Sequence, residues 1–185
     1  MDAGERAARA FVTLLLRLRH DVPRQEPPGR VPPFDRCYWV EPGRLLAGAY
    51  PGSAAEVDAL RRTVTFVVDL TEEEEVGPFS EFLVGVERVR TPIQDFSAPT
   101  EQEMAQILDT VDHALARGEV VYVHCLGGRG RTGTVVGCHL VRHGLPPDGA
   151  LARIAELRHG LPDGLAPSPE TTEQVALVRG WRPGR

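Results

Sequence analysis

The chain has 185 residues, 42% of them hydrophobic, which suits one compact domain with its own core. Its net charge of −5 argues against general affinity for nucleic acid. The three cysteines form neither an even disulfide framework nor the paired spacing of a zinc site. We therefore expect a reducing compartment, the cytoplasm, and neither a metal nor another cofactor.

Residues 1–33 are expected to precede the globular domain, which we place at 34–185. Residues 7–18 are apolar but interrupted by arginines, so they are too short and too charged to cross a membrane and predict an amphipathic helix. A connector with five prolines follows over 22–33. Packing of the helix against the domain is the favoured role, and a partner-binding arm is the alternative.

Strand and helix signals alternate from residue 38 onward. Short β-branched or aromatic runs predict strands at 38–40, 44–47, 65–70, 85–90 and 119–124. Amphipathic patterns predict helices at 53–62, 100–117, 132–142, 147–158 and 169–181. Thr100 and Glu103 stand in capping-box register, and Ser168 is predicted to cap the last helix with Pro169 at its first position. The alternation predicts an α/β fold, a central, mostly parallel sheet flanked by helices.

A glycine-rich segment joins the strand at 119–124 to the helix at 132–142. It holds Cys125 and Arg131 with five residues between them, three of which are glycine. A helix N-terminus favours an anion through its unpaired N–H groups and its dipole, and glycines let the backbone curl around that anion. The same field favours the thiolate of Cys125, and Arg131 offers two parallel donors to phosphate oxygens. The segment predicts a phosphate-binding loop, with a plain turn around a half-buried cysteine as the alternative.

The pattern His124-Cys125-x-x-Gly128-x-x-Arg131-Thr132 is similar to the signature of cysteine-dependent protein tyrosine phosphatases, in the dual-specificity branch near kinase-associated phosphatase. The resemblance implies the α/β fold of that branch. It also implies that Cys125 is the nucleophile that forms a phosphocysteine, and that Arg131 binds the phosphoryl group. Thr132 would then assist breakdown of the thiophosphate, and His124 would orient the loop and keep the thiolate stable.

The resemblance further places a general acid on a loop upstream of the nucleophile. The candidate is Asp95, in the proline-containing loop 91–99. A carboxyl group there can protonate the leaving oxygen and then act as a base toward the attacking water. A solvated loop aspartate is the alternative interpretation. Asp109 and Asp112 are interpreted as surface charges of a helix, and Asp69, which ends a β-run, is expected to have a structural role.

Predicted substrate contacts come from the loop and from one residue near the C-terminus. They are His124, Leu126, Gly127, Gly128, Arg129, Gly130 and Gln174. Gln174 resembles a glutamine that approaches the active site in many relatives, where it could position the hydrolytic water; an exposed helical glutamine is an equal alternative. The acidic run 72–75 is interpreted as solvated surface. No metal-like grouping is expected for His20, His113, His139, His143 and His159.

The favoured function is a phosphatase that hydrolyses phosphotyrosine, and also phosphoserine or phosphothreonine, through a phosphocysteine. The alternatives are a catalytically silent phospho-binding module, a phosphatase of a non-protein phosphate such as a phosphoinositide, and sulfur or arsenate chemistry on a similar loop. Phosphoinositide-acting relatives tend to carry two basic residues in the loop, whereas here Leu126 stands at the first such place and only Arg129 is basic. We expect a phosphorylated protein or small phosphomonoester as partner, with neither nucleic acid nor membrane, and leave the oligomeric state open.

Overall fold

A five-stranded sheet with the order β1-β2-β5-β3-β4 forms the centre of the molecule. The computed structural model describes residues 31–75 and 86–185, so the predicted N-terminal helix lies outside the described residues. The strands are β1 (Cys37–Glu41), β2 (Leu45–Ala49), β3 (Phe66–Asp69), β4 (Glu87–Arg90) and β5 (Val121–Cys125). β1 pairs antiparallel with β2, and the other neighbours pair in parallel. The predicted α/β class with a mostly parallel sheet is confirmed.

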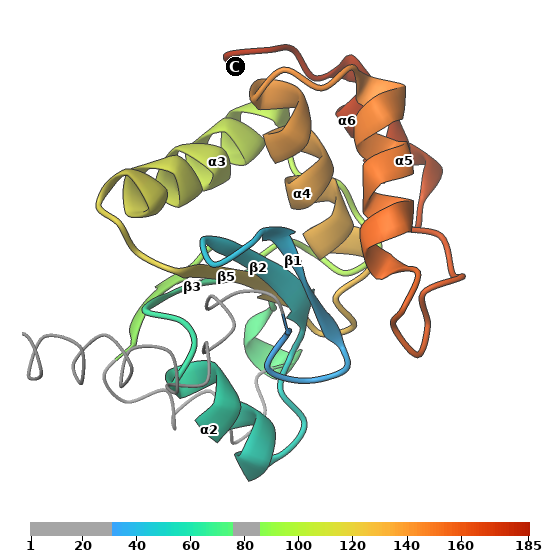
Figure 1. Cartoon of the computed structure of the whole chain (residues 1–185). Helices are drawn as coiled ribbons and strands as arrows, with labels where there is room; N and C mark the ends of the chain where they lie inside the picture. The colour runs from blue at the N-terminus through green and yellow to red at the C-terminus, as the bar shows by residue number, and fades with distance from the viewer. Residues whose placement is uncertain (1–30, 76–85) are drawn as a thin grey trace, which may run out of the picture.

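Helices cover both faces of this sheet, with α2 on one face and α3, α4, α5 and α6 on the other (Figure 1). Their bounds are α2 (Ala54–Arg61), α3 (Glu101–Ala116), α4 (Gly130–Arg142), α5 (Pro147–Arg158) and α6 (Thr172–Gly180). Successive strand residues point to opposite faces, so Phe66 and Val68 pack toward the α3–α6 side and Val67 toward α2. No helix within the described ranges is both long and apolar enough to span a membrane.

The start of α3 follows its sequence signal, whereas the start of α6 does not. Thr100 caps α3 through the predicted capping box with Glu103. The prediction that Ser168 caps the last helix is wrong, because α6 begins four residues later than Ser168 and is capped by Thr171. Thr171 has its own capping-box partner at the third helical position, and the Ser168 hydroxyl instead donates to a carbonyl of the glycine-rich loop. The 167–171 segment is therefore a support for that loop.

Sheet topology places the end of β5 at the middle of the carboxyl edge. β5 lies between β2 and β3, and Cys125 is its last residue. The chain then turns and enters α4 at Gly130, two residues earlier than predicted. Since ligands of open parallel sheets bind beyond the carboxyl ends of the strands, the turn occupies the position at which a ligand site is expected.

Candidate active site

Three carbonyls of the glycine-rich loop are held by donors from outside it. These are the Tyr50 N–H to Leu126 O (3.1 Å), the Arg158 Nη1 to Gly128 O (2.7 Å) and the Ser168 hydroxyl to Arg129 O (2.8 Å). The C=O and the following N–H of a trans peptide point in opposite directions. The N–H groups of Gly127, Arg129 and Gly130 therefore turn toward the inside of the loop, where they form a cradle for an oxyanion.

One of the three loop glycines, Gly128, is required by close backbone approach, and a second, Gly130, faces a side chain. Gly128 has a φ of 69°, and a Cβ there would lie 2.4 Å from the backbone nitrogen of Ala49. A Cβ on Gly130 would lie 2.6 Å from a carboxylate oxygen of Glu170. Gly127 has no atom within 4 Å of its Cβ position, so space does not demand a glycine there. The loop is thus pressed against β2 on one side and the 167–171 segment on the other.

The Cys125 thiol lies inside this loop, in contact with Thr132. The Thr132 hydroxyl donates to Cys125 Sγ at 3.2 Å and accepts the Cys125 N–H at 2.9 Å. Both other cysteines are buried in the apolar core, which raises the pKa of the Cys37 thiol to about 12 and that of Cys138 even further above its ordinary value. Cys125 is therefore the one thiol of the three that has loop amides and a hydroxyl donor around it.

Arg131 is almost completely buried and is held in one orientation. Its Nη1 and Nη2 donate to the two carboxylate oxygens of Glu75 at 2.6 and 2.7 Å, and Nη1 also donates to the Ile93 carbonyl at 3.1 Å. Its Nε is buried and has no hydrogen-bond partner among the described residues. A buried donor without an acceptor is costly, so the Nε edge of the guanidinium is prepared to donate to an incoming oxyanion.

Glu75 corrects the interpretation of the acidic run 72–75 as solvated surface. Its side chain is only 15% exposed because it packs on Arg131. Hydrogen bonds from Arg131 lower the pKa of Glu75 despite the opposing effect of burial. In return, these hydrogen bonds and the nearby negative groups raise the pKa of Arg131, although burial alone would lower it. Glu75 is thus a positioning carboxylate that sequence analysis missed.

Asp95 is brought to the same arginine by the loop between β4 and α3. Its Oδ1 lies 2.9 Å from Arg131 Nη2, its side chain is 44% exposed, and its N–H donates to a carboxylate oxygen of Glu72 at 3.0 Å. The next residue, Phe96, has a φ of 58° and is 60% exposed. This left-handed conformation is unusual for an aromatic residue and is typical of strain held at functional loops. Asp95 therefore combines contact with the buried Arg131 with a carboxyl group that is partly open to solvent.

Asp69, the other carboxylate near the sheet edge, is fully engaged elsewhere. It is buried, accepts from the Thr71 N–H (2.9 Å) and hydroxyl (2.6 Å), and is paired with Arg88 through Nε at 3.0 Å. His124 lies beside it, with Nε2 at 3.8 Å from Asp69 Oδ1 and Nδ1 at 3.3 Å from the Cys125 carbonyl. Burial lowers the pKa of His124 although Asp69 opposes the shift, so the ring is neutral. His124 thus links the backbone of Cys125 to the buried Asp69.

Gln174 packs beside Gly130 of the loop, and Arg129 is itself a residue of the loop. The alternative of an exposed Gln174 is wrong, because the residue is fully buried. Its Nε2 donates to the Ser97 carbonyl at 2.9 Å, and its Oε1 accepts the backbone N–H groups of Glu170 and Thr171. Gln174 therefore joins the start of α6 to the loop that carries Asp95. Arg129 forms an ion pair with Glu170.

The expectation of no metal-like grouping among the histidines is also wrong. His139 of α4 and His143, the C-cap residue of the same helix, come together with Asp112 of α3, with one possible ligand atom of each within 4.8 Å of the others. The spacing of four residues along a predicted helix was the sequence signal that could have found this pair. Asp112 is accordingly a half-buried, paired residue, while Asp109 is exposed.

A thiol and a buried arginine on one strand-to-helix loop, set on a mostly parallel sheet, are the features that define cysteine-dependent phosphatases. Residues 34–185 match the family model described as "Swiss Army Knife protein, DSP-PTPase phosphatase domain". The chain belongs to this family and carries a phosphatase domain of the protein tyrosine and dual-specificity type.

Individual relatives agree with this assignment. The chain is 34% identical over 104 residues to the "Putative tyrosine phosphatase 067L" of Invertebrate iridescent virus 3, covering 52% of this chain and 42% of that protein. It is 33% identical over 129 residues to the rat "Phosphatidylglycerophosphatase and protein-tyrosine phosphatase 1", covering 62% and 63%. The chain thus spans less than two thirds of the length of both.

Solved structures show the same fold over most of the domain. The active form of Tk-PTP superposes with a TM-score of 0.68 at 30% identity, covering 79% of this chain and 95% of that one. Kinase associated phosphatase superposes with a TM-score of 0.66 at 17% identity, covering 80% and 93%, which is a likeness of fold alone.

Proposed function

We propose that this domain hydrolyses phosphomonoesters through a phosphocysteine on Cys125, with phosphotyrosine as the preferred substrate and phosphoserine or phosphothreonine also accepted. One observation carries the proposal: in the loop that holds the Thr132-bonded thiol, the Nε of Arg131 is buried and has no hydrogen-bond partner within residues 31–75 and 86–185. A loop with outward-turned carbonyls, a fixed arginine and a thiol has the parts that phosphoryl transfer to sulfur needs.

In the first step, the Cys125 thiolate attacks phosphorus. A P–S bond forms as the P–O bond to the leaving group breaks, and the leaving oxygen takes the electron pair of that bond. The carboxyl group of Asp95 donates its proton to this oxygen. The loop N–H groups and Arg131 hold the phosphoryl oxygens as their charge is redistributed.

In the second step, water attacks the phosphorus of the phosphocysteine. The Asp95 carboxylate accepts a proton from this water, the P–S bond breaks, and sulfur leaves as a thiolate with the bonding electron pair. The Thr132 hydroxyl, 3.2 Å from Sγ, donates to that thiolate and stabilises it as a leaving group. Inorganic phosphate is released, and the thiolate is restored.

Glu75 and Gln174 act in this scheme as positioning residues. Glu75 holds the Nη edge of Arg131, so phosphoryl oxygens bind at the Nε and Nη2 side, where they displace the Asp95 carboxylate from its 2.9 Å contact. Displacement frees Asp95 for the leaving oxygen. Gln174 holds the loop of Asp95 through the Ser97 carbonyl.

The rim of the site supports an aromatic phosphate ester as the preferred substrate. Leu126, the chain neighbour of Cys125, is 45% exposed, and Phe96, the chain neighbour of Asp95, is 60% exposed. An aromatic leaving group can pack against such side chains. The ion pair between Arg129 and Glu170 neutralises the basic residue that a polyphosphorylated lipid headgroup would need.

A phospholipid monophosphate is the second candidate, favoured by the name of the rat relative. Phosphate release from matched phosphotyrosine, phosphoserine and phosphothreonine peptides, and from phosphatidylglycerophosphate in vesicles, distinguishes the candidates. We expect phosphotyrosine to give the highest kcat/KM. A higher value for the lipid would transfer the assignment to lipid phosphate. If neither these substrates nor para-nitrophenyl phosphate released phosphate, the domain would be a silent binding module. Thiosulfate and arsenate assays test the remaining alternative.

The proposed mechanism also bears on the cellular compartment of the protein. All three cysteines are free thiols, and the mechanism needs Cys125 reduced. Both points support a reducing compartment such as the cytoplasm.

A further inference from the structure

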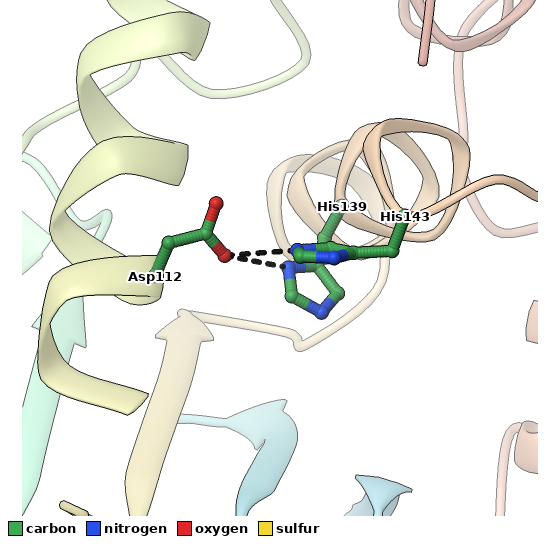
Figure 2. A group of neighbouring side chains, drawn as sticks. All are labelled: Asp112, His139 and His143. Atoms are coloured by element: carbon green, nitrogen blue, oxygen red, sulfur yellow. Dashed lines mark hydrogen bonds and ion pairs between the residues drawn. The ribbon is translucent and has the colours of Figure 1, made fainter. Parts of the chain in front are cut away.

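A second cluster of ionisable side chains lies at the opposite end of α4 from the phosphate loop. Figure 2 shows Asp112 reaching from α3 toward His139 and His143, which project from consecutive turns of α4. Asp112 Oδ1 lies 3.0 Å from His143 Nε2 and 3.7 Å from His139 Nδ1. None of these residues takes part in the proposed hydrolysis, since His139 stands eight residues after Arg131, about 12 Å along the helix.

His139 is the most informative member, because it is buried and only half satisfied. Its side chain is 2% exposed, and its Nε2 lies 3.0 Å from a carboxylate oxygen of Glu41 in β1. Its Nδ1 is buried and has no hydrogen-bond partner among the described residues. When Nε2–H donates to Glu41, Nδ1 keeps its lone pair and directs it toward Asp112 and His143. A carboxylate behind a histidine in this manner fixes the tautomer of metal-binding histidines.

The other two members supply an accessible ligand and a charge. His143 is 52% exposed, so an ion can reach the cluster from solvent and the ring is free to adjust. Arg142 donates to Asp112 Oδ2 at 2.9 Å and to Asp109 at 2.8 Å, which leaves Oδ1 for the cluster. The last turn of a helix also favours a cation through its dipole.

We propose that Asp112 Oδ1, His139 Nδ1 and His143 Nε2 form a binding site for a divalent transition-metal ion of the Zn²⁺ class. Two imidazoles and one carboxylate suit Zn²⁺ and its neighbours, whereas Ca²⁺ and Mg²⁺ prefer oxygen ligands. Bonds of about 2.0–2.2 Å require the ligand atoms to approach to within about 4 Å of one another. The ligand atoms now lie within 4.8 Å of one another, and a rotation of the exposed His143 ring would bring its nitrogen closer to the other two.

Such an ion would clamp α3 to α4 behind the catalytic loop. Two of its ligands come from α4, the third comes from α3, and Glu41 connects the buried ligand to β1. Because the ion binds the folded chain, it should stabilise that state and raise Tm in proportion to its occupancy. Hydrolysis at the other end of the helix does not need it.

The test uses the full, untagged chain in a Cys125→Ser background, which removes the loop thiolate as a competing ligand. Isothermal titration with Zn²⁺ should give one equivalent per chain and a rise in Tm, and Co²⁺ should give a visible d–d spectrum. Loss of a residue that only supports a metal ligand typically weakens metal binding by about 10- to 100-fold. His143→Ala removes a ligand itself and should weaken Zn²⁺ binding by at least that factor. His113→Ala, an exposed histidine next to Asp112, is the matched control and should leave binding unchanged.

Three outcomes would overturn the site. These are the absence of binding in the parent protein, equal Zn²⁺ affinity in His143→Ala, or an equal loss in His113→Ala. Because His143 is exposed, its alanine variant should fold, which circular dichroism and the metal-free Tm verify. Glu41→Gln is a second variant, expected to weaken binding less than His143→Ala because it acts through the His139 tautomer.

Discussion

The two ends of α4 each carry a cluster of polar and ionisable side chains, but in opposite electrostatic settings. At its N-terminal end, Cys125, Arg131 and the inward N–H groups surround a place for an anion, and Glu75 and Asp95 hold the arginine. At its C-terminal end, two histidines and a carboxylate come together as the proposed cation site. The difference follows from the helix itself, which leaves unpaired N–H groups at one end and unpaired carbonyls at the other.

Two buried cysteines, Cys125 and Cys138, lie in very different surroundings. Cys138 lies on the same helix as Arg131 and is as buried as Cys125, yet its surroundings are apolar and its thiol is kept protonated. Cys125 differs by its loop amides, by Thr132 and by the nearby guanidinium. The proposed reactivity of Cys125 therefore depends on its position in the loop and not on burial. Substitutions at the N-terminal end of α4 can test this difference.

Cys125→Ser should reduce phosphatase turnover to the background rate while leaving phosphate or vanadate binding measurable. The cradle consists of backbone amides and Arg131, whereas only the thiolate attacks phosphorus. Steady-state assays and vanadate titration of the same preparation measure both properties. Cys138→Ala is the control and should keep near-normal kcat. More than a few per cent of activity in Cys125→Ser would remove Cys125 from the mechanism.

Arg131→Lys should lower kcat by about 10²- to 10³-fold, the range typical of losing a preorganised donor to a developing oxyanion. An ammonium group can neither keep the bidentate contact with Glu75 nor present the Nε edge to phosphate. Single-turnover kinetics check the effect on the chemical step. Rates near those of the parent enzyme would contradict a phosphate-binding role for Arg131.

Asp95→Asn should lower kcat/KM by about 10²- to 10⁴-fold for alkyl or tyrosyl phosphates, whose leaving groups need a proton. The loss should be much smaller for an activated aryl phosphate. The variant should also lose the alkaline limb of the pH profile and keep the acidic one. Profiles for two substrates of different leaving-group pKa measure this. Equal losses with an unchanged alkaline limb would make Asp95 structural.

Glu75→Gln should have the smallest effect, about tenfold in kcat/KM, equivalent to about 1.4 kcal/mol. An amide keeps the shape but presents only one acceptor to the two η nitrogens of Arg131. Full activity in this variant would show that Arg131 needs no carboxylate to hold it.

Glu75 also predicts how stability depends on pH. Arg131 lowers the pKa of Glu75 in the folded state, so the pair stabilises the fold above the unfolded carboxyl pKa of about 4.3 and loses that effect as the pH falls through the folded value. Urea unfolding at neutral and acid pH should show a smaller acid loss for Glu75→Gln than for the parent protein. Equal losses in the two proteins would contradict the pairing.

Much of the fold was predictable because its signals are local. The strand before Cys125, the helix after it and the capping box at Thr100 each depend on neighbouring residues. The start of α6 was mispredicted because Ser168-Pro169 and Thr171 with Gln174 are competing cap signals a few residues apart, and contact with the loop decided between them.

The supports of the site were not predictable from one sequence. Arg158 contacts the Gly128 carbonyl across 30 residues, and Glu75 reaches Arg131 across 56. The partner of Arg158 is a backbone carbonyl, which no residue type in the sequence marks. Glu75 belongs to an acidic run, and such runs are typical of solvent-exposed surface. The grouping of Asp112 with His139 likewise required knowledge of how α3 packs on α4.

The proposed phosphocysteine on Cys125 can be trapped and identified during turnover. In Thr132→Ala the leaving thiolate loses its hydroxyl donor, so the second step should slow and the intermediate should accumulate. Mass spectrometry of protein quenched in acid during turnover should then find one added phosphoryl group, on the peptide that contains Cys125. Phosphoryl on another residue, or steady turnover with no covalent adduct in this variant, would contradict the claim.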